Sequence, residues 1–254
     1  MCGRFALDDK VNKQIEMFVL AGNDYRDWTP DEWDRWKPNF QVFPTDQIPI
    51  VVETPTDRAV PDGPTVRRVE AARWWLTPTW SKTLEVKVPT FNARAEEVSE
   101  KASFKSLLGS RRAVIPMLGF YEWTKFPKLG EKKKVYFLHA PDGTYLFAAG
   151  LYTWWANPDE LKAKRGTDQA VDWHLTTTML TRDAVGEFSA IHPRSPVFLP
   201  KDRIDEWLSP ALQGDQAFVD AISEASVPEI AALEFYEVAP LQREARGPEL
   251  IQPA

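Results

Sequence analysis

The segment Ala113-Val114-Ile115-Pro116-Met117-Leu118-Gly119-Phe120-Tyr121-Glu122-Trp123 contains two apolar runs that indicate how this chain folds. Residues 113–117 form a run of strand length, and the second run ends at Glu122, a carboxylate between two aromatic residues. Short runs rich in β-branched and aromatic residues are typical of strands. Further ranges have the same character: 48–53, 67–76, 135–139, 145–149, 174–179 and 196–199. The sequence therefore predicts a protein built mainly on β-sheet.

The helical patterns are short and lie between these runs. We expect helices over residues 31–37, 98–108, 158–164, 202–208 and 215–223. The first and fourth follow a proline and begin with acidic residues, which are signals of a helix start. Helices and strands do not alternate regularly, and this favours an α+β fold with a mainly antiparallel sheet over a parallel βαβ fold.

The chain is expected to form one domain over residues 1–254. Its 21 prolines are spread through the sequence without marking a linker, and we find no internal repeat or low-complexity segment. The stretch from Gly22 to Pro38 is rich in Trp and Asp, and we expect a surface insertion there, between the first helix and the first strand.

Composition argues against several classes of protein. The single cysteine allows no intrachain disulfide and fits a reducing compartment. Without a signal-like start or an apolar run of about 18 residues, we expect a soluble cytoplasmic protein. The net charge of −6 argues against broad coating of nucleic acid, since Lys and Arg drive phosphate binding. A local basic cleft is compatible with that charge, and we expect the lysines at 132–134 to lie in a solvated turn.

Cys2 directly follows the initiator methionine. Removal of Met1 leaves a free amine beside the thiol, and these groups ordinarily titrate at about 7.7–8 and about 8.5, so both are partly nucleophilic near neutral pH. The amine can capture an aldehyde as a Schiff base, which the thiol then closes into a five-membered thiazolidine ring. The alternative is an accidental cysteine after a start codon.

Glu122 and His192 are candidate partners for this chemistry. Schiff-base formation needs an acid to protonate the departing oxygen and a base to move protons. Glu122 follows an apolar run, where desolvation favours its protonated form, and the alternative is a surface glutamate. His192 lies in a proline-bracketed turn beside an arginine, and the alternative is a structural histidine.

Two further segments carry side chains suited to DNA. Asn92 can orient a sugar or carbonyl oxygen and Arg94 can meet a phosphate, although a helix start capped by Asn92 is the simpler explanation of residues 91–96. Residues 73–80 combine tryptophans with an arginine, a pattern that suits base stacking and equally suits a sheet core. The sequence has no phosphate loop or paired-cysteine motif, and its three histidines lack metal-ligand spacing, so no metal or cofactor is expected.

Five blocks of sequence follow one another in a specific order: Met1-Cys2-Gly3-Arg4-Phe5, Asn92-Ala93-Arg94-Ala95-Glu96, Arg111-Arg112-Ala113-Val114-Ile115-Pro116 running into Gly119-Phe120-Tyr121-Glu122-Trp123, Ile191-His192 with Arg194 and Pro196, and Gly247-Pro248-Glu249-Leu250-Ile251-Gln252-Pro253. Together they resemble the SOS response-associated peptidase (SRAP) family, also called abasic-site processing proteins. The resemblance covers essentially the whole chain.

The resemblance implies a single α+β domain with a barrel-like β core and short peripheral helices. It implies binding of single-stranded DNA in a basic cleft beside the N-terminal cysteine. That cysteine would capture the ring-opened aldehyde of an abasic site as a thiazolidine crosslink, with lyase chemistry from the shared Schiff base. The family is also credited with removing its own residue before the cysteine.

Roles for individual residues follow from the same resemblance. Besides Cys2, it implies that Asn92 holds the cysteine and sugar, that Glu122 shuttles the proton, and that His192 assists ring opening and crosslink reversal. The implied DNA contacts are Arg4, Pro44, Thr45, Trp74, Arg94, Arg112 and Arg194.

The chain departs from the family pattern at several positions. Trp75 replaces a glycine and alters the expected base-stacking surface. The family's Asn-x-Ala-Pro-Thr element reads Gln41-Val42-Phe43-Pro44-Thr45, and Pro193 replaces an aspartate beside His192, which lowers the expected basicity of the histidine. A family Val-Asn pair appears as Leu241-Gln242 or is absent. These changes bear on strand preference and reversal more than on crosslinking.

Two other functions fit the same residues. One is an N-terminal-nucleophile thiol hydrolase or peptidase that is acylated on Cys2, and the other is a non-enzymatic single-strand-binding module in which Cys2 is incidental. We expect a monomer in each case.

Overall fold

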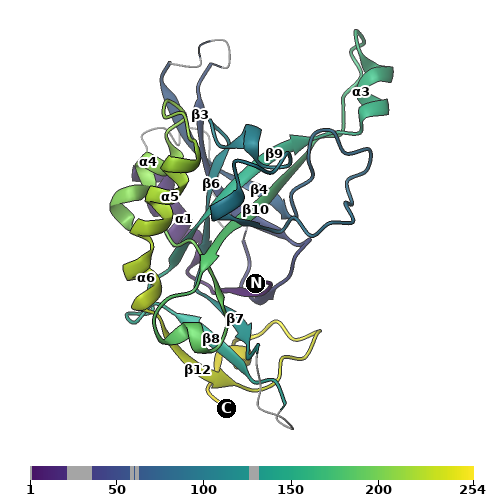
Figure 1. Cartoon of the computed structure of the whole chain (residues 1–254). Helices are drawn as coiled ribbons and strands as arrows, with labels where there is room; N and C mark the ends of the chain where they lie inside the picture. Colours follow the sequence, from purple (N-terminus) through teal and green to yellow (C-terminus); the bar gives the residue numbers. More distant parts are fainter. Residues whose placement is uncertain (1, 22–35, 58–59, 61–62, 126–131) are drawn as a thin grey trace.

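Two sheets organise the computed structural model, which describes residues 2–21, 36–57, 60, 63–125 and 132–254 (Figure 1). The larger sheet contains β3 (Gln47–Pro55), β4 (Thr65–Trp74), β6 (Arg112–Met117), β9 (Leu146–Trp155) and β10 (His174–Asp183). These strands pair in the order β10-β4-β3-β6-β9, and β9 pairs with β10 again, so the sheet closes on itself. All pairings in this ring are antiparallel except β10–β4.

Two short strands extend the ring along β10. Strand β5 (Asn92–Arg94) pairs in parallel with β10, so that Asn92 lies opposite Met179. Strand β11 (Arg194–Pro196) pairs with the end of β10 in antiparallel fashion. As a result β10 carries segments from two distant parts of the sequence.

The second sheet has the order β12-β8-β7-β1-β2 and is antiparallel throughout. Its strands are β1 (Phe5–Leu7), β2 (Asn39–Val42), β7 (Gly119–Trp123), β8 (Val135–His139) and β12 (Glu234–Val238).

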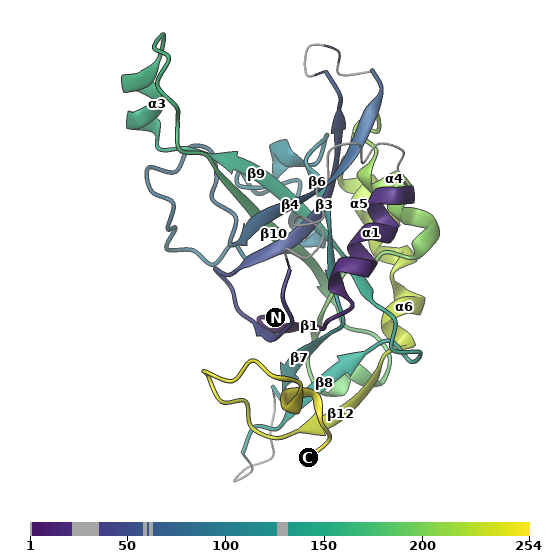
Figure 2. The same ribbon diagram turned by 180° about the vertical axis from the view of Figure 1, so that it is seen from behind.

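The chain crosses from the ring to this sheet between Met117 and Gly119. A Cβ at Gly119 would lie 2.4 Å from the carbonyl oxygen of Leu138, so this close approach requires glycine. Figure 2 shows the purple chain start and β1 below the strands of the ring and above β7, β8 and β12.

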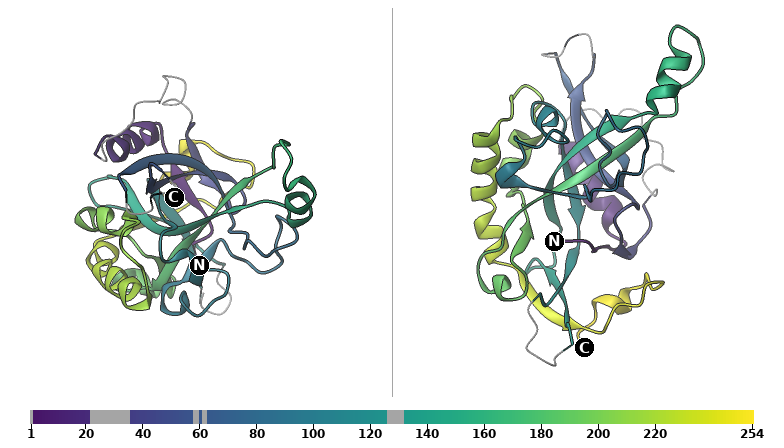
Figure 3. Two further views of the ribbon diagram at one scale, coloured as in Figure 1. Left: turned by 90° about the horizontal axis from the view of Figure 1, so that it is seen from above. Right: turned by 45° about the vertical axis from the view of Figure 1, so that its right-hand side comes forward.

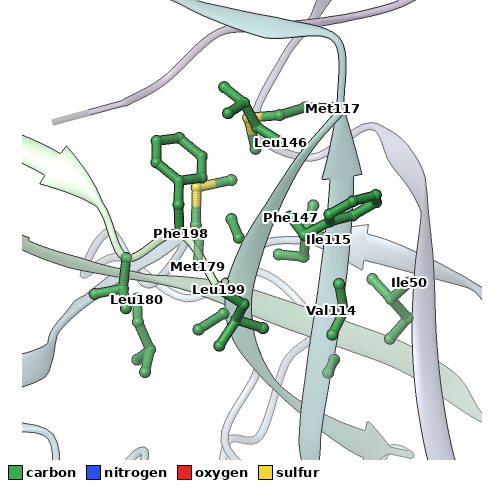
Figure 4. Packing of buried hydrophobic residues seen from close by; sticks show 14 of the residues in the cluster. Ile50, Val114, Ile115, Met117, Leu146, Phe147, Met179, Leu180, Phe198 and Leu199 are labelled. Carbon is green, nitrogen blue, oxygen red and sulfur yellow. The ribbon is translucent and has the colours of Figure 1, made fainter. Parts of the chain in front are cut away.

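The core is aliphatic and aromatic, and it lies within the ring. Side chains from β3, β6, β9 and β10 meet those of the segment after β11 (Figure 4). Ile50, Val114, Ile115 and Met179 are each 0% exposed. Full burial of one such side chain stabilises the fold by about 1.5–3 kcal/mol relative to exposure.

Most helices lie on one flank of the ring. Helices α4 (Ile204–Leu208), α5 (Gln216–Ala225) and α6 (Val227–Ala231) follow one another there, and α1 (Val11–Ala21) lies on the same flank (Figures 1 and 2). Helix α3 (Pro158–Lys164) lies instead at the end of an arm formed by β9 and β10 (Figure 3). No helix among the described residues is long and apolar enough to cross a membrane.

The predicted α+β class and the barrel-like core with short helices are confirmed. The expected helices at 158–164, 202–208 and 215–223 correspond to α3, to α4 with the turn before it, and to α5. Residues 31–35 of the expected helix 31–37, and most of the insertion expected between Gly22 and Pro38, lie outside the described residues.

The helix predicted over 98–108 is wrong. That region contains only the 3-10 turn Lys105–Leu107, and another 3-10 turn, Ala95–Glu97, directly precedes the region. Its buried residues are Val98, Phe104, Leu107 and Leu108, whereas Lys101 and Ala102, three and four residues after Val98, are exposed, so the helical spacing of buried residues is broken. The strand expected at 196–199 lies instead at Arg194–Pro196 and shares only Pro196 with the expected range. The strand at 135–139 has the predicted bounds, and the other predicted strands shift or extend at their ends.

Candidate active site at the N-terminal cysteine

Cys2 is 0% exposed and belongs to the main hydrophobic cluster. Its thiol lies 3.7 Å from the carbonyl oxygen of Arg4. Strand β1 begins three residues later and pairs with both β2 and β7, so the start of the chain is held between two strands. Burial raises the pKa of the Cys2 thiol, and the carboxyl of Glu122 raises it further.

Asn92 contacts Cys2 directly. The Nδ2 group of Asn92 donates a hydrogen bond of 2.7 Å to the backbone carbonyl of Cys2. The side chain is buried, and its Oδ1 has no hydrogen-bond partner among the described residues. Asn92 lies in strand β5, and Arg94 is the residue before the 3-10 turn, so the alternative of a helix capped by Asn92 is wrong.

Glu122 and His192 form a second buried pair. Glu122 lies on β7 opposite Tyr136 and is 3% exposed, while His192 is 7% exposed. Oε1 of Glu122 lies 3.6 Å from Nδ1 of His192. The backbone of Arg194 positions the imidazole, since its nitrogen and oxygen lie 3.1 Å and 3.0 Å from Nδ1.

Burial moves both pKa values of this pair toward the neutral forms. It raises the pKa of Glu122 to about 7 and lowers the pKa of His192 from its ordinary value. Near neutral pH, Glu122 is therefore about half protonated and His192 is largely uncharged. A carboxyl in this state can give and accept a proton within one reaction cycle.

Arg4 and Arg94 are the two expected DNA contacts that keep accessible charge. The side chain of Arg94 is 61% exposed and forms an ion pair of 3.4 Å with Glu97. Arg4 is half-buried, and its guanidinium carbon lies 3.7 Å from the centre of the Phe43 ring. Each lies two residues after a site residue in the sequence: Arg4 after Cys2, and Arg94 after Asn92.

Arg112 is a structural residue, which corrects the expectation of a DNA contact. It is 1% exposed, and its donors bond to five backbone carbonyls: those of Leu108, Gly109, Trp207, Ser209 and Leu212. An arginine has five N–H donors, so none is left for a phosphate.

Arg194 is also committed within the protein, again contrary to expectation. Its guanidinium forms ion pairs of 2.8 Å with Glu96 and 2.6 Å with Asp183, and it is 9% exposed. These contacts join β11 to β10 and fix the turn that carries His192. Arg194 therefore stabilises the turn that positions His192.

Trp74 is 0% exposed, so its ring is not accessible to a DNA base. Its Nε1 donates to the carbonyl of Phe91 at 2.8 Å, next to Asn92. Its backbone carbonyl accepts from Thr45 at 2.9 Å, and its nitrogen donates to Asp46. The sheet-core alternative is the correct one for Trp74, which ties the strand of Asn92 to the 43–46 turn.

Pro44 and Thr45 lie at the surface of that turn. Pro44 is half-buried and Thr45 is exposed. Thr45 adopts a positive φ of 86°, which is rare for a β-branched residue and costs roughly 1–3 kcal/mol. The turn maintains this conformation through its bonds to Trp74.

Sequence reasoning did not assign Phe43, Gln41 or Arg246 to the site. The guanidinium of Arg246 lies 4.7 Å from the centre of the Phe43 ring, beside Arg4. The exchange of the family alanine for Phe43 was the available signal. Within the described ranges, no three side chains of the metal-binding types come together.

Comparison with known proteins identifies the family. The model of the SOS response associated peptidase (SRAP) family matches residues 1–241. The chain belongs to this family. The abasic site processing protein YoqW of Bacillus subtilis is 31% identical to this SRAP chain over 211 residues, covering 83% of it and 81% of YoqW. YoaM of the same organism, also named an abasic site processing protein, is 32% identical over 216 residues, which cover 83% of this chain and 80% of YoaM.

A solved structure shares the fold of this chain. A crystal structure of a protein from Bacteroides thetaiotaomicron superposes with a TM-score of 0.73 at 21% identity and covers 100% of both chains. At that identity the likeness extends to the fold alone. The SRAP match ends before Arg243 and Arg246, which belong to the C-terminal segment.

Proposed function

We propose that this protein captures abasic sites in single-stranded DNA as a covalent thiazolidine on Cys2, after Met1 has been removed. The observation that carries the proposal is the grouping of Cys2, Asn92 and Glu122: a 2.7 Å bond fixes the cysteine, and a carboxyl of pKa about 7 is electrostatically coupled to its thiol. The names of the relatives YoqW and YoaM support the same substrate.

The first step is attack of the Cys2 amine on the C1′ aldehyde of the ring-opened sugar. A carbinolamine forms and then loses water to give a protonated imine (iminium ion). Asn92 keeps the cysteine in place through its carbonyl, and its Oδ1, which has no partner among the described residues, can accept a hydrogen bond from the amine or from the sugar. Protonated Glu122 supplies the proton that leaves with the carbinol oxygen as water.

The second step is closure of the ring. The thiol of Cys2 adds to the carbon of the protonated imine, the C=N electron pair returns to the nitrogen, which becomes the neutral ring amine, and the thiol proton passes to the Glu122 carboxylate left by the first step. The overall reaction joins one aldehyde and one aminothiol with release of one water. Because burial raises the pKa of the thiol, it reacts only with a base beside it, and Glu122 is that base.

His192 is proposed to act on the sugar. Its neutral imidazole can take the proton of the C1′ hydroxyl as the deoxyribose opens, and can assist the reverse reaction. The same imine is an intermediate for β-elimination, so lyase activity competes with closure by the thiol. Removal of Met1 by the protein itself would use the same groups, with Glu122 as base.

The test is a denaturing gel after incubation with single-stranded DNA that carries one abasic site. The proposal predicts a denaturant-resistant adduct for the wild type, no adduct for Cys2→Ala, and slowed formation for Glu122→Gln. Glu234→Gln, which removes an exposed carboxylate from β12, is the matched control and should behave as the wild type.

A thiol hydrolase acting on peptide or amide bonds is the alternative in the same site. It predicts release of product from a peptide substrate without DNA. The raised pKa of the Cys2 thiol disfavours the thiolate that such an enzyme needs. A non-covalent binding module predicts no adduct at all, with DNA affinity indifferent to Cys2→Ala.

A further inference from the structure

Phe43 lies beside two arginines from opposite ends of the chain. The guanidinium carbons of Arg4 and Arg246 lie 3.7 Å and 4.7 Å from the centre of its ring. Both distances are within the range of cation–π attraction. Arg4 is two residues from Cys2, so this group borders the candidate active site.

The C-terminal turn that carries Arg243 and Arg246 is held in place from β2. Nε2 of Gln41 donates to the carbonyls of Gln242 and Ala245 at 2.9 Å and 2.8 Å. The backbone nitrogen of Phe40 donates to the carbonyl of Arg246 at 3.0 Å. The yellow C-terminal segment accordingly runs below the dark-blue turn that follows β2 (Figure 2). Gln41 and Phe43, two departures from the family pattern, thus both act on this turn.

The positive charges of Arg4, Arg243 and Arg246 outnumber the carboxylates that lie near them. Burial lowers the pKa of Arg4, and repulsion from Arg246 and Arg243 lowers it further, while Asp46 opposes the shift. The carboxylate of Asp46 already accepts a hydrogen bond from the backbone of Phe43 at 2.9 Å, and Glu244 is exposed within the turn itself.

One donor of Arg4 has no acceptor. Nη1 of Arg4 donates to the carbonyl of Gly3 at 2.9 Å, while Nε is buried and has no hydrogen-bond partner among the described residues. A buried guanidinium N–H is normally bonded, and leaving it unpaired costs free energy. An external anion at the accessible end of this half-buried guanidinium would offset the like charges of Arg243 and Arg246.

We propose that Arg243 and Arg246 form with Arg4 a binding site for backbone phosphate of the single strand, on the platform of Phe43. Arg94, on strand β5, and this arginine group would each contribute phosphate contacts near Cys2. This inference rests on the proposed function for the identity of its ligand. Stacking on Phe43 restricts the guanidinium groups before DNA binds.

The test is the salt dependence of DNA binding. Affinity for an intact single strand without abasic sites is measured by fluorescence anisotropy between 50 and 200 mM NaCl, conditions over which phosphate contacts differ strongly (about 0.7 units of log–log slope per contact). Arg246→Gln and Arg243→Gln should each reduce the magnitude of the slope by about 0.7 and weaken binding several-fold at low salt. Arg165→Gln, which removes an exposed arginine just after α3, is the matched control and should leave the slope near the wild-type value.

One further variant separates phosphate binding from support of the fold. Nη1 of Arg246 also bonds the carbonyls of Arg243 and Ala245, so Arg246→Lys loses that geometry and keeps the charge. The proposal predicts that Arg246→Lys keeps the wild-type slope. It is overturned if the two glutamine variants match Arg165→Gln, or if Arg246→Lys loses as much slope as Arg246→Gln.

Failure of the proposed function would look different. Intact DNA needs no covalent step, so a wild-type protein without adducts but with reduced slopes in the glutamine variants would contradict the chemistry at Cys2 and support the phosphate site. Normal adducts with unchanged slopes would contradict the phosphate site alone.

Discussion

Oε1 of Glu122 lies 3.6 Å from Nδ1 of His192, and both side chains are less than a tenth exposed. Burial raises the pKa of the acid and lowers that of the base, so each is driven toward its neutral form. The pair is therefore poised for proton transfer near neutral pH, at a cost to the stability of the folded protein.

The buried carboxyl predicts a pH-dependent stability. The pKa of Glu122 is about 7 in the folded protein and 4.5 ordinarily, so folding favours its protonated form. Well below pH 4.5 the residue is neutral in both states. As the pH rises above 4.5, the folded state carries a growing penalty, which reaches about 3 kcal/mol above pH 7. Glu122→Gln should therefore raise the melting temperature at pH 8 and leave it nearly unchanged at pH 4.

Thermal unfolding of the wild type and Glu122→Gln across this pH range checks the prediction. Glu234→Gln, on the exposed edge of β12, should show no such trend. A difference between wild type and Glu122→Gln that stays constant with pH would contradict a raised pKa.

Asn92→Ala should slow crosslinking by about tenfold or more, because it removes the 2.7 Å bond that fixes Cys2. The rate is measured at saturating abasic DNA, so that weaker binding does not contribute. Asn157→Ala is the control: Asn157 caps α3 on the distant arm and its loss should destabilise that helix without changing the rate. Equal rates for wild type and Asn92→Ala would remove Asn92 from the mechanism.

His192→Ala should slow release of the crosslinked DNA more than its formation, since Glu122 remains to serve ring closure. Release is measured as transfer of the protein to a second strand, a labelled abasic competitor that is added in excess. Arg194→Lys, which weakens the support behind the imidazole, should give a smaller effect in the same direction. Unchanged release in His192→Ala would assign the histidine a structural role.

Trp74→Phe tests the corrected role of this tryptophan. The change removes the bond to the carbonyl of Phe91 and leaves a small cavity, at a cost of about 2–4 kcal/mol. Urea denaturation should show the loss, and crosslinking should slow because Asn92 follows Phe91. Affinity for intact single strands should change little, and a large loss of affinity in a stably folded variant would restore Trp74 as a DNA contact.

The sequence predicted the parts of the fold that repeat a local pattern. Strands β3, β6 and β8 have clear apolar runs of ordinary strand length, and α3 has both a cap and a proline at its start. Strands β1 and β5 have three residues each and take their form from pairing with distant segments. Patterns this short carry no periodic signal, so they were missed.

The candidate site residues were predicted from composition and resemblance. Which of the predicted arginines are accessible could not be predicted, because that depends on burial in the folded chain. Arg4 and Arg112 look alike in the sequence, and only the folded chain distinguishes an arginine with an open donor from one whose five donors are used. Likewise Arg246 is separated from Phe43 by about two hundred positions, and no local signal joins them.

The central claim is most directly tested by the intact mass of the protein–DNA adduct. The account predicts the mass of the protein without Met1 plus that of the abasic strand, less one water, with the attachment mapped to Cys2. Cys2→Ala, which keeps the amine, should give an adduct only when borohydride traps the imine. An adduct that retains Met1, or one that forms equally in Cys2→Ala without reductant, would contradict the account.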